Sequence, residues 1–309
     1  MTKGVLSLLI PVFNHETYLP ELFRSIDVQS RQPEEVLISD DGSQDKSTSR
    51  VSAWAAGKVN IRVFRQKKNI GITENTNFLL RKAKGDYALT LHSDDCLGTA
   101  DSLEAMANRM DRNEGIVMVT APRRMINERS KKIRVDGELT PGEYRRSEIL
   151  RKVLISEANP IGEPSAVMFR QRCLSAGFDP SYRQLWDLKG WLEILKSGNV
   201  AVLRRPLVWI REHKMQATKL NARSGRGIGE HVELFSELFR EADKVLTPRE
   251  ATVLLYKLRR TTSRYPKFIS FKTRSSLVRE KQRIGLFAYI WNLSAYRVRK
   301  FSAQFLRST

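Results

Sequence analysis

Short apolar runs alternate with amphipathic stretches over the first 120 residues. The apolar runs predict strands at residues 6–10, 35–39, 61–64, 87–91 and 116–120. Between them, apolar residues recur at helical spacing and predict helices at about residues 18–29, 43–56, 72–84 and 100–112. Strands and helices that alternate in this way are typical of a mainly parallel sheet with helices on both faces.

Local signals indicate where one of these helices begins and where another ends. Ser43 or Asp45 has the side chain of an N-cap residue and would start the second helix. Gly85 and Asp86 would stop the third helix.

The pattern changes after residue 120. Residues 121–147 are charged and lack a clear period, which predicts a loop or a short hairpin. The next segments predict a helix, an apolar run at 166–169, a short helix, a helical stretch at 185–196, and strands near 200–203 and 207–210. After residue 227 the chain reads as helical and basic. We therefore expect an α/β domain over residues 1–220 and a helical, basic region over residues 221–309.

Composition is that of an ordinary globular protein, with 41% hydrophobic and 28% charged residues in a chain of 309. The two cysteines, Cys96 and Cys173, are far apart, which argues against a disulfide framework or a cysteine zinc site and fits a cytoplasmic setting. The N-terminal apolar run ends at Pro11, and we interpret it as a buried strand and not a signal peptide. No run approaches the roughly 18 apolar residues of a membrane span.

The net charge of +20 is concentrated near the C-terminus. Residues 244–309 hold sixteen Lys and Arg against two Asp and Glu, a net charge of +14. This predicts an anionic partner, either membrane headgroups or nucleic acid, unless the cations form a solvated face. In residues 284–296 aromatic side chains accompany an apolar face with cations on both sides, which is typical of an interfacial helix on anionic lipid.

Two other interpretations of this tail stay open. The helix could pack on the α/β domain, or it could form a homo-oligomer contact. No recognised nucleic-acid module accompanies the charge, which disfavours nucleic acid. We expect a cytoplasmic protein that can lie peripherally on the inner face of the cell membrane.

Acidic clusters follow two of the predicted strands. In open α/β sheets ligands bind beyond the carboxyl ends of the strands, so both clusters indicate one site. Asp40 and Asp41 could bond a base or ribose, or only form a capped turn. Asp94 and Asp95 are adjacent and repel each other unless a cation compensates. Their oxygen ligands suit Mg²⁺ or Mn²⁺ bridging to phosphates, although acids also favour a helix N-terminus.

Several ordered blocks make the sequence resemble family 2 glycosyltransferases over about residues 5–218. The blocks are 6–14 (LSLLIPVFN), 39–45 (SDDGSQD), 69–71 (NIG), 83–87 (AKGDY), 91–95 (LHSDD), 162–165 (GEPS), 177–179 (GFD), 187–192 with its Asp and Trp-Leu pair, and 211–216 (REHKMQ). Blocks in this order at plausible spacing are more specific than any single motif.

The resemblance implies a GT-A fold, a Rossmann-like, mainly parallel mixed sheet flanked by helices, with the helical, basic region as a C-terminal extension. It implies a nucleoside-diphosphate sugar of the UDP, dTDP or GDP type as donor, and a glycan or lipid-linked saccharide as acceptor. Donor contacts are then expected from Pro11, Phe13, Asn14, Asp40, Asp41, Asn69, Asn75, Ser93, Asp94, Gly162 and Glu163. A Mg²⁺ or Mn²⁺ ion would rest on Asp94, Asp95 and His213.

Asp187 matches the family's catalytic base. An inverting transferase works by single displacement, and a carboxylate takes the proton of the acceptor hydroxyl. The chain departs from the family twice, with His92 in place of the first acid of the DxD element and Trp186 in place of the acid before Asp187. His92 could bond ribose or simply pack, and Asp187 could instead be a helix N-cap.

Two other function classes are alternatives to a glycosyltransferase. A non-catalytic nucleotide-binding or membrane-associated adaptor on the same fold would fit the two missing acids. A sugar nucleotidyltransferase would need a glycine-rich, arginine-containing loop after the first strand, where this chain has Pro11-Val-Phe-Asn14. An inverting, metal-dependent glycosyltransferase is the leading prediction.

Overall fold

The computed structural model describes residues 3–214, 216 and 226–284, and the chain divides into two compact units. The first unit comprises Met1–Arg146 and Asn159–Gln216, and the second comprises Ser147–Ala158 and Ala217–Thr309. Segment Ser147–Ala158 lies inside the predicted α/β range but groups with the C-terminal helices. Glu157, in this segment, pairs with His231 and Lys257 of those helices.

The first unit is built on an eight-stranded mixed sheet in the order β3-β2-β1-β4-β10-β6-β11-β9. The strands are β1 (Leu6–Val12), β2 (Glu35–Asp40), β3 (Ile61–Arg65), β4 (Tyr87–Thr90), β6 (Ile116–Thr120), β9 (Gly142–Tyr144), β10 (Val167–Arg170) and β11 (Asn199–Val202). β1 pairs in parallel with both β2 and β4, whereas β10 runs antiparallel between β4 and β6. This mixed sheet confirms the predicted fold class.

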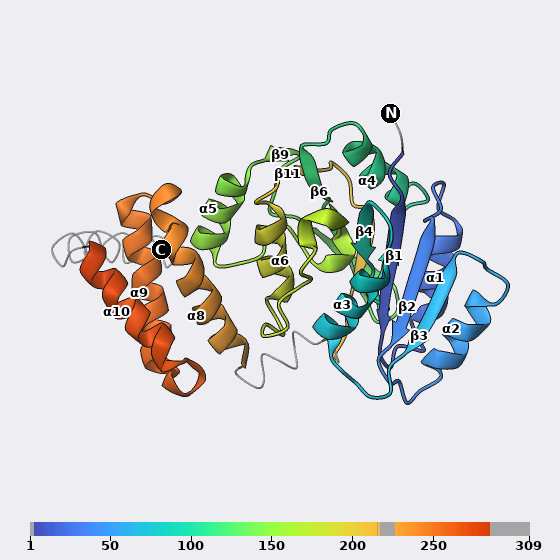
Figure 1. The fold of residues 1–309 in the computed structure, drawn as a ribbon, viewed down its shortest axis with the longest axis horizontal. Helices are drawn as coiled ribbons and strands as arrows, with labels where there is room; N and C mark the ends of the chain where they lie inside the picture. Colours follow the sequence, from blue (N-terminus) through green and yellow to red (C-terminus); the bar gives the residue numbers. More distant parts are fainter. Residues whose placement is uncertain (1–2, 215, 217–225, 285–309) are drawn as a thin grey trace, which may run out of the picture. The chain divides into compact units, whose positions relative to one another are not determined.

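Helices cover both sides of the sheet, with α1 and α2 on one side and α3 on the other (Figure 1). The helices of this unit are α1 (Leu19–Asp27), α2 (Ser47–Ala55), α3 (Ile72–Lys82), α4 (Ser102–Asp111) and α6 (Trp186–Ile194), with 3₁₀ turns at Pro164–Ala166 and Gln171–Leu174. All seven residues of β1 are buried, as expected of a central strand packed on both faces. Helices that cover both faces therefore leave only the ends of the strands open to ligands.

A second sheet of four strands, in the order β5-β12-β7-β8, includes the region after residue 120 for which a loop or short hairpin was expected. Its strands are β5 (Cys96–Leu97), β7 (Arg123–Asn127), β8 (Lys132–Asp136) and β12 (Val208–Glu212). The hairpin expectation is confirmed, because β7 and β8 pair in an antiparallel ladder. The parallel pairing of β7 with β12, far along the chain, was not predicted.

One predicted helix start is wrong. α2 begins at Ser47 and not at Ser43. The backbone N–H of Ser43 bonds the Asp40 carboxylate at 2.9 Å, and the N–H of Gln44 bonds the Asn14 side chain at 2.8 Å. These bonds hold the segment as a turn between β2 and α2.

The second unit is helical and includes most of α5 (Arg146–Ser156), with α8 (Arg226–Leu238), α9 (Pro248–Arg264), α10 (Phe271–Ile284) and 3₁₀ turns at Phe239–Lys244 and Pro266–Phe268. Five apolar residues that recur at helical spacing in this region are all buried: Val232, Leu234, Phe235, Leu238 and Phe239. A capping box of Thr247 and Glu250 begins α9. Beyond residue 284, the predicted interfacial segment lies outside the described residues. Among the helices that are described, none combines the length and apolar character that a membrane crossing needs.

Candidate active site

Residues 92–95, called here the acidic loop, lie where the strand order of the main sheet reverses. β1 has β2 on one side and β4 on the other, so the ends of β1 and β4 form a topological switch point. Asn14 and His15 follow β1, and residues 92–95 follow β4. The sheet thus brings together side chains that are about eighty residues apart.

Asp94 forms the centre of the loop. Its Oδ2 atom lies 2.9 Å from Nε2 of His213, which follows β12. Burial would raise the pKa of Asp94, but the His213 hydrogen bond and the nearby His15 and His92 lower this pKa to about 2. Asp94 is therefore a carboxylate near neutral pH, suited to a cation.

His15 completes the cluster around Asp94. Ligand atoms of His15, Asp94 and His213 all lie within 4.8 Å of one another, the geometry of a candidate metal site. Nδ1 of His15 lies 2.8 Å from the Ser93 hydroxyl, which leaves Nε2 for a ligand. Burial lowers the pKa of His15, so its imidazole is neutral and has a lone pair to offer.

Asp95 faces into the protein. It is 4% exposed, and its two carboxylate oxygens accept hydrogen bonds from the Ser165 hydroxyl at 2.6 Å and the Arg211 N–H at 2.9 Å. Burial, followed by the charge of Asp94, raises its pKa well above the ordinary value. Asp95 also belongs to a second cluster, with His92 and Asp94, whose ligand atoms lie within 4.8 Å.

A buried guanidinium supports the loop from behind. Arg211 is 1% exposed; its Nε donates to the Asp94 carbonyl at 2.8 Å, and it pairs with Glu21 at 2.6 Å. Its guanidinium also lies over the Tyr18 ring, 4.7 Å from the centroid. A charge this deeply buried needs such partners, and together they fix the backbone of the acidic loop.

His92 stands where the family places an acid. Its backbone N–H donates to the Ser165 hydroxyl at 3.0 Å, and its ring lies 6.3 Å from the Trp186 ring. Nε2 of His92 is buried and has no hydrogen-bond partner in the part of the chain that the structure describes. Burial lowers the pKa of His92, so the ring is neutral and cannot replace the charge of the missing acid.

Asp187 lies in the first turn of α6 and is partly exposed. Leu185 is the N-cap residue, so Asp187 is not the helix cap. Its carboxylate accepts hydrogen bonds from the Asn159 amide at 3.1 Å and the Leu188 N–H at 2.8 Å. Burial is the main cause that raises the pKa of Asp187 to about 7, and the charge of Glu163 adds to it.

The segment before β10 connects the loop at residues 92–95 with Asp187: Ser165 bonds Asp95, and Asn159 bonds Asp187. Gly162 adopts φ +120°, and a Cβ there would lie 2.9 Å from the Arg123 side chain, so the position requires glycine. Its carbonyl accepts hydrogen bonds from the Asn159 amide and the Trp191 indole N–H, both at 3.0 Å. Glu163 pairs with Arg123 at 2.8 Å.

Apart from Asp94, Gly162 and Glu163, the residues expected to contact the donor fall into two groups. Phe13, Asn14 and Asn69 are exposed and accessible to a ligand. Pro11, Asp40, Asp41, Asn75 and Ser93 are buried.

The carboxylates of this buried group bond the chain itself. Asp40 accepts hydrogen bonds from the Ser43 N–H and the Thr48 hydroxyl. Asp41 accepts from the N–H groups of Ile70 and Gly71, at 2.8 and 2.9 Å. Burial raises the pKa of Asp41.

The model of Glycosyl transferase family 2 matches residues 7–178, more than half of the chain. The chain belongs to this family. It is 28% identical to an uncharacterized protein of Mycobacterium tuberculosis over 221 residues, 68% of either chain. It is also 26% identical to the abequosyltransferase RfbV of Salmonella typhimurium over 193 residues, 58% of this chain and 56% of that protein.

Solved structures support the same fold. S. aureus TarS 1–349 in complex with UDP-GlcNAc superposes with a TM-score of 0.63 at 18% identity, covering 91% of this chain and 80% of that one. The mannosyltransferase PcManGT from Pyrobaculum calidifontis, solved with GDP-Man and Mn²⁺, gives a TM-score of 0.55 at 14% identity, covering 94% and 84%. The protein is therefore a glycosyltransferase with a GT-A fold, and the adaptor interpretation is set aside.

Sequence reasoning about this family 2 glycosyltransferase missed three groups that the site contains. These groups are His15, which contacts Ser93, Arg211, which contacts the acidic loop, and Asn159, which contacts Asp187. One signal was available for His15, because it follows the end of β1 directly and the chain has only four histidines. Arg211 stands in the motif block at 211–216, but the block does not indicate its contacts. Asn159 carries no comparable signal, since its partner Asp187 is distant in the sequence.

Proposed function

We propose that this glycosyltransferase is an inverting enzyme that moves a sugar from a nucleoside-diphosphate donor to a hydroxyl of a glycan or lipid-linked saccharide. The observation that carries the proposal is Asp187, a partly exposed carboxylate whose pKa of about 7 suits a general base near neutral pH. The two solved neighbours, crystallised with UDP-GlcNAc and GDP-Man, support a nucleotide-sugar donor.

Asp187 would act on the acceptor. Its carboxylate takes the proton of the attacking hydroxyl while the new bond forms at the anomeric carbon and the bond to the diphosphate breaks. Asn159 and the Leu188 N–H hold the carboxylate in place, so little reorganisation is needed when it acts. The second acid that the family carries at position 186 is not required for this step.

The residues present fit a divalent cation. A carboxylate oxygen of Asp94 and imidazole nitrogens of His15 and His213 lie within 4.8 Å of one another, and both kinds of donor bind divalent transition metals. We assign the ion to Asp94, His213 and His15. When bound, it would neutralise charge that develops on the departing diphosphate.

Asp95 was also predicted as a ligand. Both of its oxygens already accept protein hydrogen bonds, so we assign it the role of fixing the loop. Mg²⁺ prefers oxygen ligands, so two imidazoles favour Mn²⁺ over Mg²⁺.

The nucleoside would lie against the end of β1, on the exposed Phe13 and Asn14. A direct contact between Asp41 and the base stays a prediction. Asp41 would in addition hold the backbone of Ile70 and Gly71 in place, beside the exposed Asn69. Gly162 and Glu163, between the acidic loop and Asp187, would border the transferred sugar and the acceptor.

A nucleotide screen by thermal shift tests the donor class. Bound ligand stabilises the folded state by mass action, about 2.7 kcal/mol at a hundredfold excess over Kd. We expect one of UDP, dTDP or GDP, with Mn²⁺, to raise the unfolding temperature more than CMP, and the matching nucleotide sugar to support transfer. If no nucleoside diphosphate stabilises the protein with either cation, the proposal is contradicted.

A further inference from the structure

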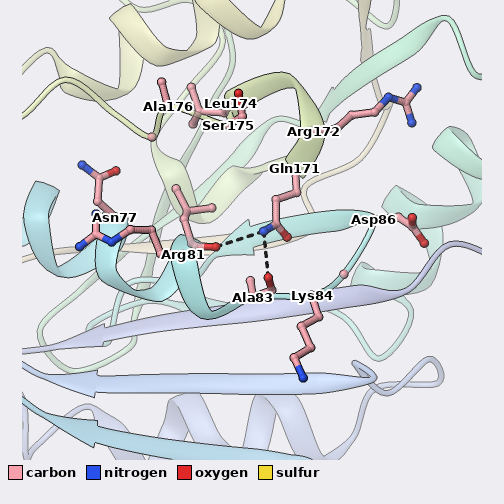
Figure 2. Close-up of a pocket in the computed structure, with 13 residues that line it drawn as sticks. Asn77, Arg81, Ala83, Lys84, Asp86, Gln171, Arg172, Leu174, Ser175 and Ala176 are labelled. Atoms are coloured by element: carbon pink, nitrogen blue, oxygen red, sulfur yellow. Dashed lines mark hydrogen bonds between the residues drawn. The ribbon is translucent and has the colours of Figure 1, made fainter.

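Two features of the described surface lie outside the candidate active site. The first is a hollow of about 380 Å³ beside the end of α3, where Figure 2 shows that Arg81, Lys84 and Arg172 point away from one another. Ligand sites hold polar groups that converge, and these three do not. The second feature is the turn between α9 and α10 of the helical unit (Figure 1), where apolar and cationic side chains are exposed together.

Large apolar side chains are exposed on and after this turn. Phe268 is 43%, Phe271 77% and Val278 47% exposed. Phe271 and Val278 lie on the same face of α10, because seven residues are close to two helical turns. Single exposed apolar residues are common, whereas several that share one short surface mark an interaction site.

Cations border the apolar residues of α10 on both sides. At 3.6 residues per turn, Arg274 lies on one side of Phe271 and Val278, and Lys272 and Arg279 lie on the other. All three cations are exposed. These five residues, Phe271, Lys272, Arg274, Val278 and Arg279, are called here the outer face of α10.

Acids are missing from this stretch of the sequence. Residues 251–279 hold eight Lys and Arg and no Asp or Glu. Two of the eight have internal partners, because Lys257 pairs with Glu157 and Arg259 donates to a carbonyl of α10 at 3.3 Å. The next acid along the chain, Glu280, is half-buried and lies on the opposite side of α10 from Phe271. The outer face therefore carries a formal charge of +3 with no acid among its residues.

The outer face is supported from behind. Ile269 and Leu277 are 4% and 2% exposed, and α10 packs on α8 and α9. A Cβ on Gly229 of α8 would collide with the carbonyl oxygen of Phe268, so glycine lets α8 approach the turn closely. The backbone that presents Phe271 is thus already ordered, and binding through it would cost little further ordering.

We propose that the outer face of α10 binds an anionic lipid surface. Phe271 and Val278 would enter the boundary between headgroups and acyl chains, while the flanking cations contact lipid phosphates, as in an interfacial helix. The contact would be made by α10 itself. It needs neither residues 285–309 nor the donor site.

Three other partners fit this face less well. In a symmetric dimer the outer face would meet its own copy, and like charges would oppose each other. Residues 285–309 hold cations and no acid, so their docking on the face would also place cations against cations. Single-stranded nucleic acid stacks its bases on aromatic rings, and the aliphatic Val278 offers no ring.

Vesicle flotation of the full chain tests the proposal, with phosphatidylcholine vesicles that contain or lack phosphatidylglycerol. Phe271→Ser should weaken binding to the anionic vesicles at least about tenfold, since tenfold corresponds to about 1.4 kcal/mol and burying a Phe side chain contributes at least that much. Phe271→Trp should retain the binding, because Trp also favours the interface. Val59→Ser removes a fully exposed apolar residue of the first unit and should bind like the wild type.

Charge reversal supplies a second arm. Lys272→Glu/Arg274→Glu should also lower the affinity for anionic vesicles at least about tenfold, because each cation near such a surface contributes to binding. Acids are favourable in the first turn of a helix, so this variant should fold with an unchanged unfolding temperature. The control Arg50→Glu/Arg112→Glu makes the same change in net charge at two exposed arginines of the first unit, so it should bind more tightly than the α10 variant.

Absence of wild-type binding to anionic vesicles would overturn the proposal. So would wild-type affinity in both Phe271→Ser and Lys272→Glu/Arg274→Glu, or equal losses in these variants and their controls. A change confined to the oligomeric mass, or to binding of DNA, would assign the face to a second copy or to nucleic acid and overturn the lipid contact. Stabilisation by nucleotide with Mn²⁺ should be unchanged in every variant, which separates this test from that of the donor site.

Discussion

Asp187 shows how one partly buried carboxylate can serve chemistry at a cost in stability. Its pKa of about 7 lies well above the ordinary 3.8, mainly because burial disfavours its charged form. At neutral pH the side chain is thus divided between a form that can accept a proton and one that cannot. A surface carboxylate would be ionised throughout, but it would be a weaker base.

The activity of the enzyme should follow this pKa. Below pH 7 Asp187 is protonated and cannot take the acceptor proton, so kcat/KM should rise about tenfold per pH unit and level off above about pH 7. Asp187→Asn should lower transfer by about 10²–10⁴-fold, keep nucleotide binding, and remove this acid limb. The exposed, Lys58-paired Asp27 gives a matched control, Asp27→Asn. Transfer by Asp187→Asn at the wild-type rate would contradict the assignment.

Stability supplies an independent readout of the same group. Because the folded-state pKa is raised, the protonated form favours folding, and this contribution is fully present below pH 3.8 and lost as pH rises through about 7. The unfolding temperature of the wild type should therefore fall relative to that of Asp187→Asn over this window. A constant difference between the two proteins would indicate an unperturbed Asp187.

At the scale of elements, the candidate metal site is assembled from the ends of three strands. His15 follows β1, Asp94 follows β4, and His213 follows β12 of the second sheet. Each strand is fixed by its own ladder, and Arg211 bonds the loop after β4 from β12. The three ligand atoms therefore converge because two sheets meet at this point.

Removing either His15 or His213 should weaken the binding of Mn²⁺. We expect His15→Ala and His213→Ala each to raise the Mn²⁺ dissociation constant by at least about tenfold, measured from the signal of free Mn²⁺ by electron paramagnetic resonance. His231→Ala, in the helical unit and paired with Glu157, is the matched control. Unchanged Mn²⁺ affinity in His15→Ala would remove His15 from the proposed ligand set.

At the scale of the whole molecule, charge is divided unevenly. Residues 244–309 carry +14 of the net +20, and the predicted catalytic chemistry lies in the other unit. Within the helical unit, Glu157 pairs with Lys257 and Glu250 pairs with Arg151. The peripheral membrane location remains a prediction that rests on this charge and on the aromatic segment 284–296.

Vesicle co-sedimentation tests that prediction. The full chain should bind vesicles that contain anionic lipid and not neutral ones, and binding should fall steeply with salt, because the Debye length shrinks from about 10 Å at 0.1 M to about 3 Å at 1 M. Removing the tail cations Arg297, Arg299 and Lys300 together should weaken this binding, since each contributes about 1 kcal/mol near an anionic surface. Binding to neutral and anionic vesicles alike would contradict an electrostatic anchor.

Local pattern was enough to predict most of the first unit. Its strands and helices follow from runs of apolar residues and helical spacing, and these are properties of adjacent residues. The predicted start of α2 was wrong because Asp40 and Asn14 accept hydrogen bonds from the turn before the helix. Asn14 lies about thirty residues from that turn in the sequence. The four-stranded second sheet was missed for the same reason, since β7 and β12 are brought together only by folding.

The sequence by itself determined the family, and it singled out Asp94 and Asp187 as candidate site residues, because ordered motifs and strand ends are local signals. Only the tertiary structure decided how those acids differ. The histidines around Asp94 lower its pKa against the effect of burial, whereas burial raises the pKa values of Asp95 and Asp187. The fold also places the ring of His15 beside that of His213. These effects depend on desolvation and on contacts across the chain, and neither can be read from the order of the residues.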